Sequence, residues 1–265
     1  MKPTKSLLIV GLFCFLFNMS SCQDYLPGYD FELFKNTPAY ALAKAVERDD
    51  TANILKLALV NKINIDYQEQ KFGNTLLMLS IVNKKNNSFK TLLKLGANPN
   101  LKNNYSNNTA FLVACDFCDM LPNNIEVLSE LIHYGAVVNS IQVSDRVKKD
   151  GTVIHYSSTP LIEVTSNNCN KAVRLLVENG ADINKVLRDG YGAITYALLV
   201  DNLEAAKYFL IEKKANIPEY CLIRNKGEKN EIKLTISDLL KEQDYSDDPK
   251  KEELKKELLS FLKGK

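Results

Sequence analysis

Few residues in this chain have the type and spacing that chemistry requires. Cys115 and Cys118 form a C-x-x-C pair, the spacing of thiol–disulfide catalysts and of half of many zinc sites. A redox pair works at a helix N-terminus, where the helix dipole lowers the thiol pKa, but the surrounding pattern places this pair at the end of a helix. Zinc would need two further ligands, and the sequence has no second C-x-x-C and no H-x-x-x-H. We therefore predict structural cysteines and no metal.

The two histidines add no catalytic site. His133 precedes Tyr134 and Gly135 near a predicted helix C-terminus, where a partly charged imidazole is simply favourable. His155 lies in a β-prone stretch. Neither has a serine, cysteine or carboxylate at the spacing of a triad, and the sequence has no Gly-x-Ser-x-Gly and no phosphate-binding loop. The sequence thus predicts no enzyme, no cofactor and no small-molecule substrate.

Charge and composition exclude two further classes of protein. The chain has 265 residues, of which 45% are hydrophobic and 25% are charged, and a formal net charge of +2. Because the first 21 residues hold two lysines and no acid, the remainder is formally neutral. A neutral chain lacks the basic stripe of a nucleic-acid binder and the polybasic surface of a peripheral membrane protein.

The N-terminus has the pattern of an export signal. Lys2 and Lys5 precede an apolar stretch of 11 residues, 7–17. A membrane-spanning helix needs about 20 apolar residues, so this stretch is too short to remain as a span. Residues 1–21 are therefore predicted to be a secretory signal peptide.

The signal ends in small residues directly before Cys22. This junction resembles that of bacterial lipoproteins, with Met19 where a leucine is usual. The resemblance implies cleavage before Cys22 and lipidation of its sulfur, and two or more acyl chains anchor stably where one would not. The residue after Cys22 is Gln23 and not aspartate, which resembles the sorting signal of outer-membrane lipoproteins in Gram-negative bacteria. We therefore expect an exported protein on the periplasmic or surface face of the membrane. Plain secretion with an unmodified Cys22 is the alternative.

Behind the signal, the chain repeats itself. Gly73–Ser80 opens a unit that closes with Leu92–Asn100, and Ser157–Val164 opens another that closes with Leu175–Asn184. Further units open at 38, 107 and 190, which gives spacings of 35, 34, 50 and 33 residues.

These units resemble the ankyrin repeat, whose signature is G-x-T-P-L-H-x-A followed by L-L-x-x-G-A-D-x-N. The resemblance implies an all-α fold, an ankyrin-repeat solenoid of about 5–6 repeats. The expected organisation is the signal peptide, a lipidated tether over 22–37, the array over 38–242 and a C-terminal capping helix within 243–265. Leu254, Leu258 and Leu262 recur every four residues after Pro249, as expected of an amphipathic closing helix.

The spacing of 50 residues marks an insertion between repeats 3 and 4. Two β-prone runs flank Asp150-Gly151, which predicts a β-hairpin. With a two-residue turn, Val147 would oppose Ile154. The finger that results is either a probe for a partner or a neutral insertion in a surface loop.

A second insertion, 115–124, lies between the helices of repeat 3, on the side away from the fingers. In an oxidising compartment, its Cys118 could pair with Cys169, which stands at a nearly equivalent loop position in the next unit. Free buried thiols are the alternative.

Ankyrin arrays usually bind partners on the concave face formed by their fingers and first helices. Aromatic residues and arginine dominate interface energies, and the fingers here contain both. Ordinary solvated loops are the alternative. The predicted partner-binding residues are Lys71, Phe72, Lys102, Tyr105, Lys148, Lys149, Asp150, His155, Tyr156, Arg188, Asp189 and Tyr191.

Together these features predict a lipid-anchored module that binds another protein. One form is an immunity protein that sterically neutralises a toxin acting in the envelope. The alternative is an envelope scaffold or surface protein that supports a periplasmic enzyme or host contact. The expected partners are another protein and, through the anchor, a membrane, but no nucleic acid.

Overall fold

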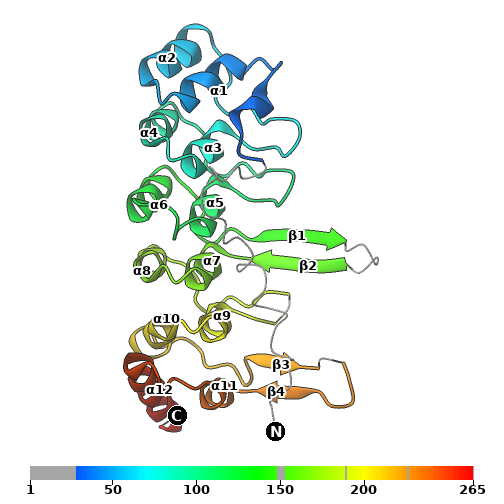
Figure 1. Ribbon diagram of the computed structural model, residues 1–265, viewed down its shortest axis with the longest axis vertical. Helices are drawn as coiled ribbons and strands as arrows, with labels where there is room; N and C mark the ends of the chain where they lie inside the picture. Colours follow the sequence, from blue (N-terminus) through cyan, green and yellow to red (C-terminus); the bar gives the residue numbers. More distant parts are fainter. Residues whose placement is uncertain (1–27, 148–152, 189, 226, 265) are drawn as a thin grey trace.

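The computed structural model describes residues 28–147, 153–188, 190–225 and 227–264. Its helices form successive pairs stacked into an elongated array (Figure 1). The pairs are α1 (Tyr40–Glu47) with α2 (Thr51–Leu55), α3 (Leu76–Val82) with α4 (Asn86–Lys94), α5 (Ala110–Asp116) with α6 (Asn124–His133), α7 (Pro160–Ser166) with α8 (Asn170–Glu178), α9 (Ala193–Leu199) with α10 (Leu203–Lys207), and α11 (Ile236–Glu242) with α12 (Pro249–Lys263). The helix-pair array predicted from the repeats is confirmed.

The pairs stack in two rows. The first helices, α1 to α11, contact one another in sequence, while the second helices lie in an outer row on the side away from the loops (Figure 1). The leucine, alanine and phenylalanine side chains between the rows are buried, including Leu76, Phe111 and Leu176, each at 0% exposure. No single pair could bury its apolar face alone, so the array depends on stacking.

Threonines begin most of the first helices. The Thr75, Thr109 and Thr159 hydroxyls accept hydrogen bonds from the backbone N–H groups of Met78, Leu112 and Ile162. Each bond satisfies one of the N–H groups left over at a helix start. Thr235 makes the reciprocal bond with Asp238 at the start of α11.

Two second helices end in a π-helical turn, at Lys56–Val60 after α2 and at Tyr208–Glu212 after α10. In both repeats a lysine with positive φ, Lys62 or Lys214, stands where other repeats have glycine. From the start of the second helix to this positive-φ residue, these two repeats have one residue more than the repeats that contain α4 and α8. The π-helical turn, which is wider than an α-helical one, accommodates the additional residue.

The inserted hairpin is present, but its predicted register is wrong. Strands β1 (Gln142–Val147) and β2 (Val153–Ser158) pair antiparallel, with Val147 opposite Val153 and Arg146 opposite Ile154. The predicted two-residue turn would have placed Val147 opposite Ile154, so the observed register differs from the predicted one by one residue. The turn residues 148–152 lie outside the described residues.

A second, unpredicted hairpin joins the fifth and sixth pairs. Its strands are β3 (Leu222–Arg224) and β4 (Ile232–Leu234), and it projects on the same side as β1 and β2 (Figure 1). The fold is therefore mostly helical rather than purely α.

The segment before α1 differs from a free tether. Phe31–Phe34 forms a 3₁₀ helix whose two phenylalanines, at 4% and 0% exposure, enter the core against α1. The segment 22–37, expected to be a tether, therefore includes residues that pack on the array, and Cys22 lies outside the described residues. Among the helices described, none has the length and apolarity needed to cross a bilayer.

Candidate partner-binding surface

Hydrogen bonds between side chains and backbone lock the fingers of repeats 2 and 3 together. The Asn103 amide donates to Asn74 Oδ1 over 2.8 Å, and both asparagines are buried. The backbone N–H of Asn104 donates to the Phe72 carbonyl, also over 2.8 Å. Asn74 Nδ2 in turn donates to the Gly28 carbonyl over 2.6 Å. Because these buried polar groups satisfy one another, the two fingers form one rigid edge.

A buried carboxylate shapes the tip of the first of these fingers. Glu69 is 1% exposed, and its oxygens accept from the backbone N–H groups of Lys71, Phe72 and Asn74 at 2.7 to 3.1 Å. Backbone N–H groups that surround an anion in this way hold the chain in a tight loop. In this loop Lys71 is exposed and Phe72 is half-buried.

The predicted residues of these two fingers come together at one place, which we call the finger patch (Lys71, Phe72, Lys102 and Tyr105). The Phe72 and Tyr105 rings meet edge to face with centroids 5.8 Å apart. Lys71 Nζ lies 5.0 Å from the Phe72 ring centroid, and Tyr105 is 65% exposed. The Lys102 carbonyl accepts from Gln68 Nε2 over 2.8 Å, which ties Lys102 to the neighbouring finger.

The base of the inserted hairpin is fixed to the array on two sides. Asn107 Nδ2 donates to the Val143 carbonyl over 2.7 Å. Tyr156, predicted to face a partner, is 40% exposed, but its hydroxyl donates to Glu163 of α7. Burial raises the Glu163 pKa, against hydrogen bonds from Ser158 and Tyr156 that lower it. The Tyr156 pKa is raised by burial and by the same carboxylate.

The other predicted residues are distributed differently. Arg188 is exposed and Tyr191 half-buried in the finger before α9, beyond the hairpin. His155 belongs to β2, where its backbone stands opposite Asp145. Lys148, Lys149, Asp150 and Asp189 lie outside the described residues.

The cysteines make a staple between repeats. Cys118, in the insertion of repeat 3, is joined to Cys169, just before α8, by a disulfide with an Sγ–Sγ distance of 2.16 Å. Cys115 is fully buried as a free thiol, and burial raises its pKa well above the ordinary value. Such a thiol is a poor nucleophile. Within the described ranges, no group of three His, Cys, Asp or Glu side chains could hold a metal ion.

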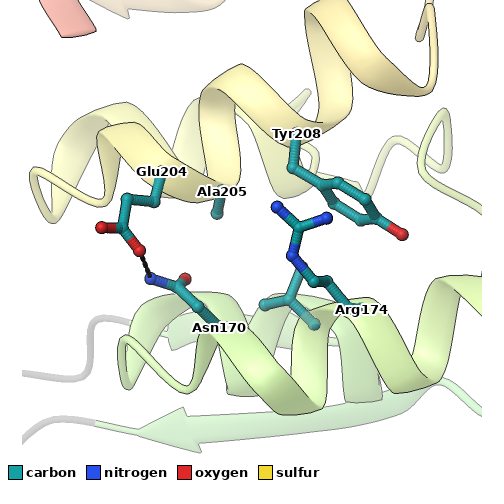
Figure 2. A pocket seen from close by; sticks show the side chains of 6 residues that line it. Asn170, Arg174, Glu204, Ala205 and Tyr208 are labelled. Atoms are coloured by element: carbon teal, nitrogen blue, oxygen red, sulfur yellow. Dashed lines mark hydrogen bonds between the residues drawn. The ribbon is translucent and has the colours of Figure 1, made fainter.

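A small hollow lies between the outer helices α8 and α10 (Figure 2). Its volume is about 30 Å³, and Arg174 stacks over the Tyr208 ring at 4.2 Å beside it. Asn170 and Glu204 close the other end with a 2.9 Å hydrogen bond. A space of this size holds about one water molecule and is too small for an organic ligand.

Sequence reasoning missed the residues that organise this surface. Glu69, Asn74 and Asn103 were ordinary loop residues in the sequence, yet they fix the finger patch. One signal was available, since Asn74 and Asn108 immediately precede the capping threonines of α3 and α5. Gly28 and Tyr29, which pack against repeats 2 and 3, had no such signal.

The comparisons with known proteins agree with this geometry. Residues 42–142 match a model of ankyrin repeats in three copies, and residues 162–210 match a second model of ankyrin repeats in many copies. The matches stop and resume around the hairpin, and together they cover more than half of the chain. A search of curated proteins found no match. Repeat spacing, stacked helix pairs and family models agree, and the chain belongs to the ankyrin-repeat proteins.

Proposed function

We propose that this chain is an exported, lipid-anchored protein-binding module whose inserted hairpin grips one specific partner. Ankyrin repeats typically bind other proteins, and the binding needs no chemistry from the repeat protein itself. The anchor is Cys22, lipidated after removal of residues 1–21. The module faces the periplasm or the cell exterior.

The observation that carries the proposal is the way the hairpin is mounted. An isolated two-stranded ribbon is only marginally stable, yet both strands of this one are bonded to rigid repeats at their base. The hairpin also interrupts the regular array between the two family matches. Because the hairpin beside the concave face is already held in place, its insertion into a cleft of a partner costs little further conformational entropy.

The disulfide supports export. Structural disulfides form in oxidising compartments and are rare in a reducing cytosol. The Cys118–Cys169 bond links the consecutive repeats 3 and 4 across a sequence separation of 51 residues.

Among specific roles, we propose an immunity protein. The hairpin and the neighbouring fingers would cover the active site of a toxin or phospholipase delivered into the envelope. Co-expression with an envelope-acting toxin encoded beside this chain tests the role. Killing should fall in the presence of the chain, and unchanged killing would remove the immunity role.

A pull-down from envelope extracts tests hairpin recognition. One variant replaces residues 144–155 with a short Gly-Ser turn, and the matched control shortens the connection between β3 and β4. The first variant should lose the dominant partner and the control should keep it, with both unfolding cooperatively. Equal capture by both, or several weak partners and no dominant one, favours the scaffold alternative.

A further inference from the structure

We propose that the finger patch lies on the membrane to which the chain is anchored and contacts anionic lipid headgroups there. The inference rests on the proposed lipidation of Cys22. It assigns Lys71, Phe72, Lys102 and Tyr105 to the bilayer and leaves the hairpin for the protein partner.

The first step is the place where the chain leaves the array. The Gly28 carbonyl accepts from Asn74, and the Tyr29 carbonyl accepts from Asn83 Nδ2 over 2.9 Å. The Tyr29 ring packs edge to face on Phe117 at 5.8 Å. A Cβ atom on Gly28 would lie 3.5 Å from the Phe72 ring. The exit point is therefore fixed against the finger patch itself.

The second step is the length of chain that remains. Residues 23–27 separate Cys22 from Gly28. A fully extended chain covers at most about 3.6 Å per residue, so the Gly28 Cα lies within about 22 Å of that of the lipidated cysteine. The lipid chains leave that cysteine directly into the hydrocarbon layer. The finger beside Gly28 is therefore tethered within about 22 Å of the lipidated cysteine, close enough to reach the membrane surface.

The third step is the chemistry of the two fingers, 68–74 and 101–108. Their only acid is Glu69, which is buried with its carboxylate on three backbone N–H groups. Lys71, Lys102 and Tyr105 are exposed, and the half-buried Phe72 ring meets the Tyr105 ring edge to face. Lysines favour anionic headgroups, and aromatic rings favour the interface between headgroup and acyl chain.

Another exposed apolar surface competes for this role. Leu55, Leu59 and Val60 are 42%, 55% and 73% exposed at the N-terminal end of the array. They lie on α2 and the turn after it, in the outer row, whereas the chain exits among the fingers (Figure 1). Because Gly28 lies beside the finger patch, we infer that the patch and not this apolar surface faces the membrane. The experiment below distinguishes the two surfaces.

The test maps lysine acylation on the lipidated full chain. The protein is placed in vesicles of phosphatidylcholine with phosphatidylglycerol, and in detergent as the reference. Lys71 and Lys102 should react about fivefold more slowly in the vesicles, since a lysine near an anionic surface gains about 1 kcal/mol. Lys94 and Lys171, exposed on the outer helices α4 and α8, are the matched controls and should not change.

Two variants sharpen the result. Insertion of a long Gly-Ser linker after Gln23 should abolish the protection, because the exit would no longer hold the fingers at the surface. Lys71→Glu should reduce the protection of Lys102, while Lys94→Glu with Lys171→Glu should not. Vesicles of phosphatidylcholine alone should give weaker protection.

Three outcomes would overturn the inference. If labelling is equal in vesicles and in detergent while mass spectrometry finds an acyl chain on Cys22, the proposed membrane contact is wrong and the proposed anchor stands. Protection of Lys56 and Lys62 instead would place the end of the array on the membrane. An unacylated Cys22 removes the anchor and this inference together.

Discussion

The Tyr156 hydroxyl donates a hydrogen bond of 2.8 Å to Oε1 of Glu163, which joins the base of the inserted hairpin to α7. Glu163 is 8% exposed. The bond thus connects the segment that we propose to grip a partner with the interior of the array. A carboxyl so far from water needs its hydrogen-bond donors, and Tyr156 and Ser158 supply them.

Glu163→Gln should stabilise the protein at neutral pH. Burial raises the Glu163 pKa above its ordinary value of 4.5 in the folded state. As pH rises from 4.5 through the raised folded value, the unfolded chain releases this proton first, so wild-type stability falls over that range. Glutamine carries no charge and should remove this fall. Urea unfolding of both proteins should give equal stability near pH 4 and a more stable variant at pH 7; a less stable variant at pH 7 would contradict the assignment.

Tyr156→Phe should loosen the hairpin base while leaving the repeats folded. The substitution keeps the ring and removes the one donor that the hydroxyl offers Glu163, which should cost about 1 to 3 kcal/mol of unfolding free energy. Amide hydrogen exchange should speed up in β2 and α7 and stay unchanged in α11 and α12. Uniform acceleration along the array would show that the effect is not local. Tyr67→Phe, whose ring packs on Phe34 at the N-terminal end of the array, serves as the control.

Cys118→Ser with Cys169→Ser should destabilise the junction between repeats 3 and 4. Closing a loop with a sequence separation of 51 residues is worth about 4 kcal/mol in the chain-entropy account. Reduction of the wild-type protein should lower its melting temperature to that of the double variant, and reduction of the variant should change nothing. Cys221→Ser removes a buried free thiol and separates thiol loss from disulfide loss. Reductant-insensitive melting of the wild type would argue against the staple.

The sequence predicted the repeats because their signals are local. Thr75, Thr109 and Thr159 cap helices where the signature places a threonine, and Pro249 begins α12 as expected. A capping hydroxyl acts on an N–H group three residues away, so its effect can be recognised within a short window.

The features that sequence reasoning missed depend on contacts across repeats. The Gly28 carbonyl meets Asn74, 46 positions along the chain, and Asn103 meets Asn74 across 29. Two β-prone runs and an Asp-Gly pair did not determine which residues of the two strands face each other, and the predicted hairpin register was wrong by one residue. The membrane-facing role of the finger patch likewise requires knowing where the chain leaves the array.

Gly73 provides the sharpest test of the locked fingers. Its φ is +73°, and a Cβ atom there would lie 2.7 Å from the backbone nitrogen of Asn104 in the next finger. Gly96 also has a positive φ, +90°, but a Cβ atom there would meet nothing within 4 Å. Both glycine-to-alanine changes place a side chain in the left-handed region, which costs about 1 to 2 kcal/mol.

Gly73→Ala must also separate the two fingers, because the clash is with backbone that cannot rotate away. We therefore expect it to destabilise the protein by clearly more than Gly96→Ala in urea unfolding, and to raise the accessibility of Phe72 and Tyr105. If the finger patch binds lipid as a rigid unit, Gly73→Ala should also weaken the protection of Lys71 in vesicles while Gly96→Ala leaves it intact. Equal destabilisation by the two substitutions would mean that the fingers yield independently, and the bond from Asn104 to Phe72 would then be incidental to the surface.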